Sequence, residues 1–206
     1  MSKTPIVNQV RYILIIFSVF LFSLTVISCK SSDDDDLTSS TSSTGLFVTV
    51  GDNGIILTSS DGISWTKRTS GTTKNLYGVT YGNSTFVTVG DNGTIFTSSS
   101  GTSWTSRTSG TSKELRGIIY ANSTFVTVGD NGTILTSGDG TSWTARTSGI
   151  ASNDPDESNE LYGVTYGNNT FVAVVSSGNI IRSTGNGSSF DNETPETNRT
   201  LYGVGF

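Results

Sequence analysis

Histidine is absent from this 206-residue sequence, which also has only one cysteine, three prolines and 14% charged residues. The absence of histidine excludes His-based catalytic triads and histidine-ligated metal or haem sites, and a single cysteine excludes an internal disulfide. Positive charge is scarce as well: 12 Lys and Arg stand against 17 Asp and Glu, and they form no cluster. Because binding to phosphates needs clustered basic side chains, we expect no nucleic-acid partner, and we expect neither a metal nor a cofactor.

Long hydrophobic runs are also missing, with one exception near the N terminus. The apolar segment Tyr12–Ser28 follows a weakly basic stretch, as in a secretory signal peptide. It ends at Val26-Ile27-Ser28-Cys29, which resembles the lipobox of bacterial lipoprotein precursors. The resemblance implies a lipoprotein signal peptide over residues 1–28, its removal, and acylation (palmitate) at Cys29. We therefore expect a lipid-anchored protein of the bacterial cell envelope, held in the outer membrane and exposed at the surface. The alternative is an uncleaved membrane anchor.

Residues 29–44 have almost no apolar side chains and include four consecutive aspartates, Asp33–Asp36. Low hydrophobicity and mutual repulsion predict a disordered tether behind the lipidated cysteine. An acidic cluster at this place also resembles the surface-export signals of some lipoproteins, and a simple spacer explains it equally well. A calcium site is a poor alternative, because consecutive side chains diverge.

From Gly45 onward the sequence repeats itself, and residues 45–206 form the predicted folded domain. Three copies share the string FVTVGDNG and a fourth reads FVAVVSSG, with spacings of 39, 39 and 46 residues. Each copy alternates apolar and polar residues between turn sequences such as Asn-Gly, which predicts four short strands. Four strands in about 40 residues are typical of a β-propeller blade, and neighbouring blades must stack to bury their faces. The copies begin at Phe47, Phe86, Phe125 and Phe171, and tryptophan recurs at Trp65, Trp104 and Trp143.

The ends of the repeat array predict how the blades close. The first copy begins with its second strand, whereas Leu201–Phe206 reads LYGVGF and matches the first-strand sequence LYGVTY. We therefore predict an all-β fold: a β-propeller of four four-stranded blades closed by the C-terminal strand, which removes exposed sheet edges. The alternative is an open array whose ends pair between chains.

The turn strings TSSDGISW and TSGDGTSW resemble the Asp-box (BNR) repeat, and VGDNGTI resembles repeats of the photosystem II assembly and stability factor family and of sialidase-like propellers. The resemblance implies that the Asp-box is a structural hairpin between the third and fourth strands. We therefore interpret Asp61 and Asp139 as turn formers whose side chains accept hydrogen bonds from the backbone. Three equivalent arginines suggest a sialidase-like cluster, but their place on outer strands favours surface pairing or packing of their stems on tryptophan: Arg68, Arg107 and Arg146.

Residues that break the repeat are the candidate binding residues, because a repeated scaffold does not require them. One arginine stands where the other copies have tyrosine, a second occurs only in the fourth copy, and a polar insert before that copy adds four carboxylates. The predicted partner-binding residues are therefore Asp154, Asp156, Glu157, Glu160, Arg116 and Arg182.

These features predict a non-catalytic, lipid-anchored binding or assembly scaffold for a protein or glycan partner. The alternatives are a sialidase-like glycoside hydrolase, which needs paired carboxylates, and a purely structural surface protein. The sialidase Arg-Ile-Pro motif is absent. Glu114 and Glu160 precede two inner strands, and neither has an evident partner in the sequence for such a carboxylate pair.

Overall fold

The computed structural model describes residues 45–150, 159–193 and 197–206, which form antiparallel sheets and no α-helix. The predicted signal peptide, Cys29 and the tether lie outside the described residues. The first sheet contains β1 (Phe47–Val50), β2 (Ile56–Ser59) and β3 (Thr66–Arg68). The second contains β4 (Leu76–Gly82), β5 (Thr85–Gly90), β6 (Thr94–Ser98) and β7 (Thr105–Arg107).

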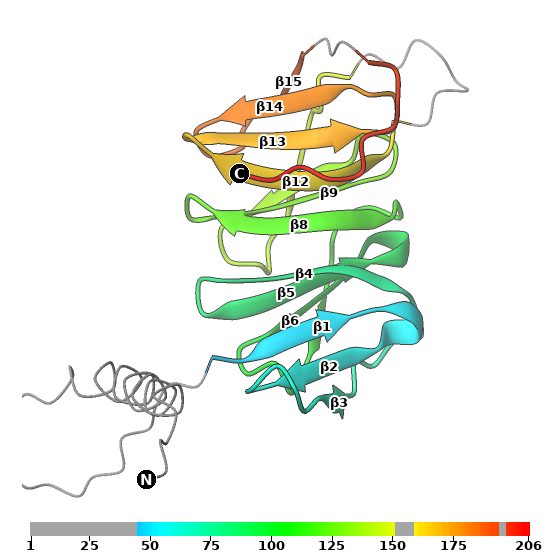
Figure 1. The fold of residues 1–206 in the computed structure, drawn as a ribbon, viewed down its shortest axis with the longest axis vertical. Coiled ribbons are helices and arrows are strands. Elements are labelled where there is room, and N and C mark those ends of the chain that lie inside the picture. The colour runs from blue at the N-terminus through cyan, green and yellow to red at the C-terminus, as the bar shows by residue number, and fades with distance from the viewer. Residues whose placement is uncertain (1–44, 151–158, 194–196) are drawn as a thin grey trace, which may run out of the picture. The chain divides into compact units, whose positions relative to one another are not determined.

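The last two sheets follow the same order. The third contains β8 (Leu115–Ala121), β9 (Thr124–Gly129), β10 (Ile134–Ser137) and β11 (Thr144–Arg146). The fourth contains β12 (Leu161–Gly167), β13 (Thr170–Val175), β14 (Ile180–Thr184) and β15 (Asp191–Glu193). Each strand pairs with the next one along the chain, so every sheet is a meander, and the four sheets stack on one another (Figure 1). The predicted all-β fold built from propeller blades is confirmed.

Turn chemistry places the strands where the repeat predicts them. Asn83 and Ser84 both have positive φ, 45° and 56°, and join β4 to β5 in a two-residue hairpin. In the GDNG turns, Asn53 and Gly54 have φ values of 54° and 68° in the short 3-10 helix η1 (Asp52–Gly54). The same turn recurs as η2 (Asp91–Gly93) in the second sheet. Asparagine and glycine are the residues that adopt this conformation at low cost, so these turns set the strand register.

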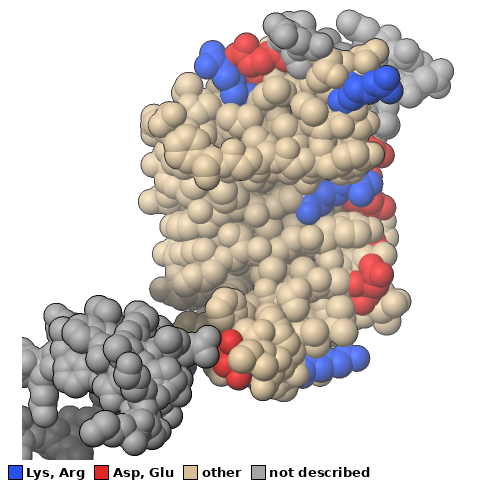
Figure 2. Space-filling view, viewed as in Figure 1, with Lys and Arg blue, Asp and Glu red and all other residues tan. Residues whose placement is uncertain are grey.

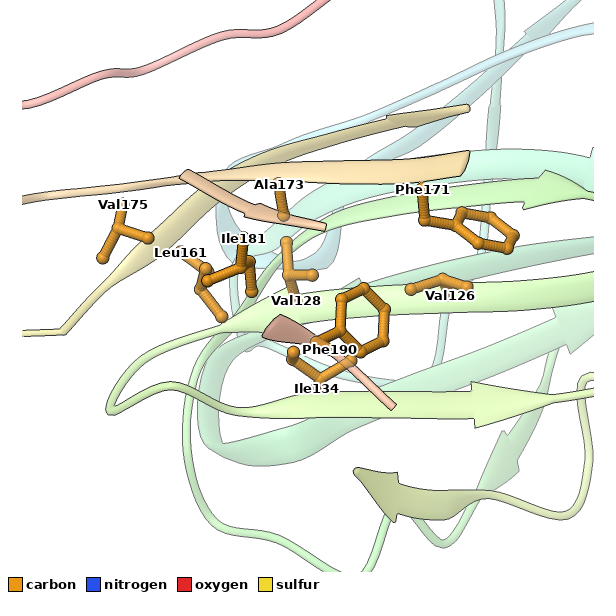
Figure 3. Close-up of a cluster of buried hydrophobic side chains, with 9 residues drawn as sticks. All are labelled: Val126, Val128, Ile134, Leu161, Phe171, Ala173, Val175, Ile181 and Phe190. Carbon is orange, nitrogen blue, oxygen red and sulfur yellow. The ribbon is translucent and has the colours of Figure 1, made fainter. Parts of the chain in front are cut away.

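The hydrophobic core lies between the sheets. Val126 and Val128 of β9 face Phe171 and Ala173 of β13, and all four side chains are fully buried. Figure 3 shows these side chains and their neighbours from the third and fourth sheets pointing toward one another. Because each such cluster needs two sheets, a blade cannot bury its faces alone, as the repeat predicts. The remaining buried members of this cluster are Ile134, Leu161, Val175, Ile181 and Phe190.

Glycines let the first strands of neighbouring sheets approach closely. A Cβ atom at Gly78 in β4 would lie 3.2 Å from the carbonyl oxygen of Arg116, and one at Gly117 in β8 would lie 3.0 Å from that of Tyr162. Side chains at these positions would push the strands apart. The first strands β4, β8 and β12 therefore run along one face of the stack, with their backbones in contact.

The C-terminal segment differs from its prediction. Leu201 donates its backbone N–H to the Val175 carbonyl at 3.3 Å, and the Phe206 ring covers Gly167 as the Tyr120 ring covers Gly82. Leu201–Phe206 thus lies on β12, as β8 lies on β4, and crosses the end of the stack opposite β1 (Figure 1).

The predicted closure of the first sheet by this segment is therefore wrong: the first sheet has three strands, and among the described residues β1 pairs only with β2. The contacts between neighbouring blades set the angle between them locally. Four such blades leave the two ends of the stack apart.

The repeated polar residues of the described blades make local contacts within their own sheets. Asp61 accepts hydrogen bonds from the backbone N–H groups of Ile63 and Ser64, both at 2.8 Å, and these bonds lower its pKa to about 2. Asp139 makes the equivalent bonds, which lower its pKa also. The tryptophans Trp65, Trp104 and Trp143 donate to glycine carbonyls in the same turns, and Arg68, Arg107 and Arg146 donate to Thr58, Thr97 and Thr136.

Candidate functional site

A bulge at the start of each first strand turns one side chain out of the regular pleat. The register of β4 with β5 shifts between Leu76 and Gly78, and equivalent shifts occur in β8 and β12. Bulges are often found where a sheet must re-aim a side chain. The bulged residues, with the equivalent residue of the C-terminal segment, form what we call the first-strand column: Tyr77, Arg116, Tyr162 and Tyr202.

Arg116 lies at the centre of this column. Its guanidinium carbon is 5.8 Å from the ring centroid of Tyr77 and 5.3 Å from that of Tyr162, within the range of cation–π attraction. The Tyr162 ring in turn contacts Tyr202, with 5.1 Å between centroids. The column is therefore continuous from the second sheet to the C-terminal segment.

Two carboxylates hold the arginine in place. Arg116 Nε is 2.6 Å from Asp130 Oδ1, and Nη2 is 2.9 Å from Glu114 Oε2. Burial of the guanidinium opposes its charge, but the hydrogen bond that Arg116 donates to Asp130 and the nearby carboxylates of Asp130, Glu114 and Glu160 raise the pKa of Arg116 above its ordinary value. Only a quarter of its side chain is exposed, so Arg116 is a fixed and already paired cation.

The tyrosines also donate to carboxylates. Tyr77 Oη donates to Asp91 Oδ1 at 2.5 Å, and Tyr162 Oη donates to Glu160. The hydrogen bond to Glu160 raises the pKa of Tyr162 to about 12, and that to Asp91 raises the pKa of Tyr77 in the same direction. Both phenols are therefore neutral near pH 7.

The column consequently carries excess negative charge. Four carboxylates bond to column side chains, which include one guanidinium and otherwise neutral phenols: those of Asp91, Glu114, Asp130 and Glu160. Figure 2 shows acidic and basic side chains along the edge at which β8 begins in Figure 1 and others at the two ends of the stack, while most of the face is uncharged. The arrangement presents tyrosine rings beside carboxylates, a surface suited to cationic and aromatic groups.

The structure brings only some of the predicted binding residues together. Arg116 belongs to the column, and Glu160 lies beside it, where its carboxylate bonds to Tyr162 and adds to the negative field at Arg116. Arg182 lies on β14 and pairs with Glu193 of β15, on the outer strands of the fourth sheet. The remaining three predicted residues, Asp154, Asp156 and Glu157, lie outside the described residues, so their role stays a prediction.

Glu114 forms an ion pair with Arg116, and Glu160 accepts a hydrogen bond from Tyr162. Asp91 and Asp130 also contact the column, although they were not among the predicted binding residues, since a residue repeated in every GDNG turn is easily taken as turn chemistry alone. The signal was a constant offset of 14 residues, which joins Tyr77 to Asp91 and Arg116 to Asp130.

Other site types find no support among the residues the structure describes. No group of three or more His, Cys, Asp or Glu in those ranges is placed to hold a metal ion. Within the same ranges, no helix has the length and hydrophobicity needed to span a membrane.

Comparison with known proteins identifies the fold. No model of a known protein family matches the sequence, and no curated protein matches it. Among solved structures, the chain is similar to YCF48 bound to D1 peptide, with 18% identity, a TM-score of 0.57, and coverage of 76% of this chain and 53% of that one. It is similar to YCF48 from Cyanidioschyzon merolae, with 19% identity, a TM-score of 0.58, and coverage of 77% and 55%.

A third similar structure is the computationally designed Ika8 protein, with 12% identity, a TM-score of 0.51, and coverage of 77% of this chain and 51% of that one. At these identities the likeness shows the fold alone. The chain spans about half the length of the solved proteins that it matches.

Proposed function

We propose that this chain is a non-catalytic binding or assembly scaffold that holds a segment of a protein partner on the first-strand column. The observation that carries the proposal is the composition of the column. Its one cation is already paired with two carboxylates, whereas the carboxylates of Asp91 and Glu160 bond to neutral donors among the described residues. Asp91 accepts from the Tyr77 hydroxyl and the Asn75 backbone N–H, and Glu160 accepts from the Tyr162 hydroxyl. The preferred partner segment therefore carries lysine or arginine.

The geometry supports a peptide rather than a reacting substrate. A fixed cation, neutral phenols and satisfied carboxylates form a rigid surface with donors and acceptors, and a rigid surface binds with a small entropic cost. The fold is that of YCF48, and one structure of that protein is described as bound to D1 peptide. This supports a protein partner here, of unknown identity.

The lipid anchor is part of the proposal. Acylation at Cys29 would tether the scaffold to a bacterial envelope membrane, with the outer membrane as the proposed location, and would restrict its partners to that surface. Replacement of Cys29 by alanine is expected to abolish incorporation of labelled palmitate and to leave the precursor uncleaved. Normal processing and membrane recovery of that variant would contradict the anchor, and would leave the proposed binding surface untouched.

The binding test uses the full chain as bait in envelope extracts, with captured proteins quantified by mass spectrometry. The column variant Asp91→Asn with Glu160→Gln removes two charges with little change of shape. We expect it to lose captured partners, and we expect wild-type capture to fall with added salt. The control is Asp191→Asn, which removes an exposed charge on β15, far along the sheet from the first strand.

Capture that is equal for the column variant and the wild type would overturn the proposed surface. A second bait, in which residues 151–157 are replaced by the short linker TSKE of the second copy, tests the predicted role of Asp154, Asp156 and Glu157. We expect this bait to keep its melting temperature and to capture less partner. Binding to a glycan array with no captured protein would favour the glycan alternative instead.

A further inference from the structure

We propose that a second copy of this chain completes the first sheet: Leu201–Phe206 of each copy pairs with β1 of the other. The first sheet has β1 as an edge strand, while the three other sheets each have a first strand at that position. The C-terminal segment has the first-strand sequence and makes no strand pair within its own chain's described residues. An unpaired edge is a ready template for a strand from another molecule.

An aromatic pair is split between the two ends of the chain. In each of the other sheets, a phenylalanine of the second strand contacts a tyrosine of the first, as Phe125 contacts Tyr120 with 4.5 Å between centroids. Phe47 is the equivalent phenylalanine, and its side chain is 56% exposed, whereas Phe125 is fully buried. Phe206 stands at the position of Tyr120 and is 84% exposed. Each copy therefore exposes both halves of one contact that its own fold keeps apart.

The register of the second sheet transfers directly to this interface. There Val79 is the Cα partner of Thr88, and Tyr81 is that of Phe86. A shift of 39 residues turns Thr88 into Thr49 and Phe86 into Phe47, and the C-terminal segment supplies Val204 and Phe206 as their partners.

The polar groups at the edge match as well. Thr88 donates its hydroxyl to the Gly78 carbonyl at 2.8 Å, and the equivalent Thr49 is exposed. Asp91 accepts the Tyr77 hydroxyl, whereas the equivalent Asp52 is exposed and its carboxylate makes no hydrogen bond to a described residue. The second copy would supply the Gly203 carbonyl to Thr49 and the Tyr202 hydroxyl to Asp52. The same chemistry that holds a first strand in the complete sheets is thus present and unused at this edge.

The occupant is a second copy rather than the same chain, because the segment already lies on β12 at the end of the stack opposite β1 (Figure 1). Exchange between two copies is reciprocal: each gives one segment and receives one, so a two-fold dimer leaves neither edge open. The length of the chain is consistent with such a dimer, because one copy spans about half of each of the solved propellers that it matches. Two copies would supply the blades of one closed ring.

Cross-linking between single-cysteine variants tests the register. Thr49→Cys and Val204→Cys are made separately in the full chain carrying Cys29→Ser, and the two proteins are unfolded, mixed and refolded under oxidising conditions. Directly opposed residues of antiparallel strands lie within disulfide range. We expect a disulfide-linked dimer from the mixture and none from either protein alone. The control mixture pairs Val204→Cys with Lys67→Cys, which is exposed on β3, and it is expected to remain unlinked.

A single chain that carries both Thr49→Cys and Val204→Cys distinguishes pairing between two copies from pairing within one chain. A disulfide within one chain, with no cross-link in the mixture, would show closure by the chain's own segment and overturn the proposal. An absence of any disulfide at the paired positions would overturn it too.

Sedimentation velocity provides a test that needs no cysteine chemistry. The full chain with Cys29→Ser is expected to sediment with twice the 21.7 kDa chain mass. Phe206→Asp is expected to weaken association at least tenfold. The matched control is Ile63→Asp, because Ile63 is also 84% exposed but lies in a turn away from the edge. A wild-type chain that stays monomeric at every concentration would overturn the dimer, and partner capture, measured separately, would still report on the first-strand column.

Discussion

The first and second sheets have nearly the same sequence and different surroundings. FVTVGDNG occurs in both, yet Val89 is fully buried in the second sheet while Val50 is only half-buried in the first. Thr88 is fully buried, and its equivalent Thr49 is exposed. The first sheet lacks two neighbours that the second sheet has: a first strand and, because it lies at the end of the stack, a preceding sheet on one face. Burial in a repeat protein is thus a property of the stack, and identical residues contribute different amounts to stability in different blades.

The largest effect on stability is expected at the repeated phenylalanine, which is buried in the third sheet and exposed in the first. Phe125→Ala is expected to lower the free energy of unfolding by about 3–5 kcal/mol, because it leaves a cavity between two sheets. Phe47→Ala is expected to cost about 1 kcal/mol or less at protein concentrations too low for association. Urea unfolding monitored by fluorescence measures both. Equal losses at low concentration would contradict the difference in burial between the two sheets.

A second comparison is between a glycine that a neighbouring ring packs against and a glycine with open space around it. A Cβ at Gly82 would overlap the Tyr120 ring of the next sheet, whereas one at Gly138 would meet nothing. Gly82→Ala is therefore expected to lower stability by about 1–3 kcal/mol through overpacking. The control, Gly138→Ala, is expected to change it little. Thermal unfolding of the two variants checks the difference, and similar melting temperatures would mean that the first strands are less closely packed than described.

A third prediction compares the phenol pKa of a column tyrosine when it does and does not donate a hydrogen bond to a carboxylate. The phenol pKa of Tyr162 is raised from 10.0 to about 12 by its hydrogen bond to Glu160. The stabilisation from this bond is fully present below pH 10 and is lost as the pH rises through about 12. Titration of tyrosine absorbance is expected to show late-titrating phenols, one of which, Tyr162, moves toward pH 10 in Glu160→Gln. An unchanged titration curve in that variant would contradict the contact.

The smallest effect is expected at a turn position that is aspartate in the first sheet and serine in the second. Asp61→Ser gives the first sheet the residue that the second has at Ser100, and we expect a small fall in melting temperature. Because backbone hydrogen bonds lower the pKa of Asp61 to about 2, its stabilising contribution is present above pH 3.8 and is lost as the pH falls toward 2. The gap between variant and wild type is therefore expected to close in acid. If the difference in melting temperature persists in acid, it does not come from the Asp61 carboxylate.

Sequence reasoning worked best where the cause is local. Asn53 and Gly54 predict the positive-φ turn, and Asp61 predicts its own backbone bonds, because both depend on neighbours within a few residues. Column members were predicted in part. Arg116 was identified because it breaks the repeat, while Asp130 was missed because it keeps the repeat and acquires its role only through a contact 14 residues away.

The sequence by itself determined the all-β class, the strands of each blade, the turns between them and the need for blades to stack, since alternation, turn residues and a fixed period encode these features locally. Only the tertiary structure decided that the stack is open, because the angle between blades arises from side chains packed across two sheets. It also decided that Leu201–Phe206 lies on β12 rather than beside β1, and that bulged residues from separate strands meet in one acidic, aromatic column.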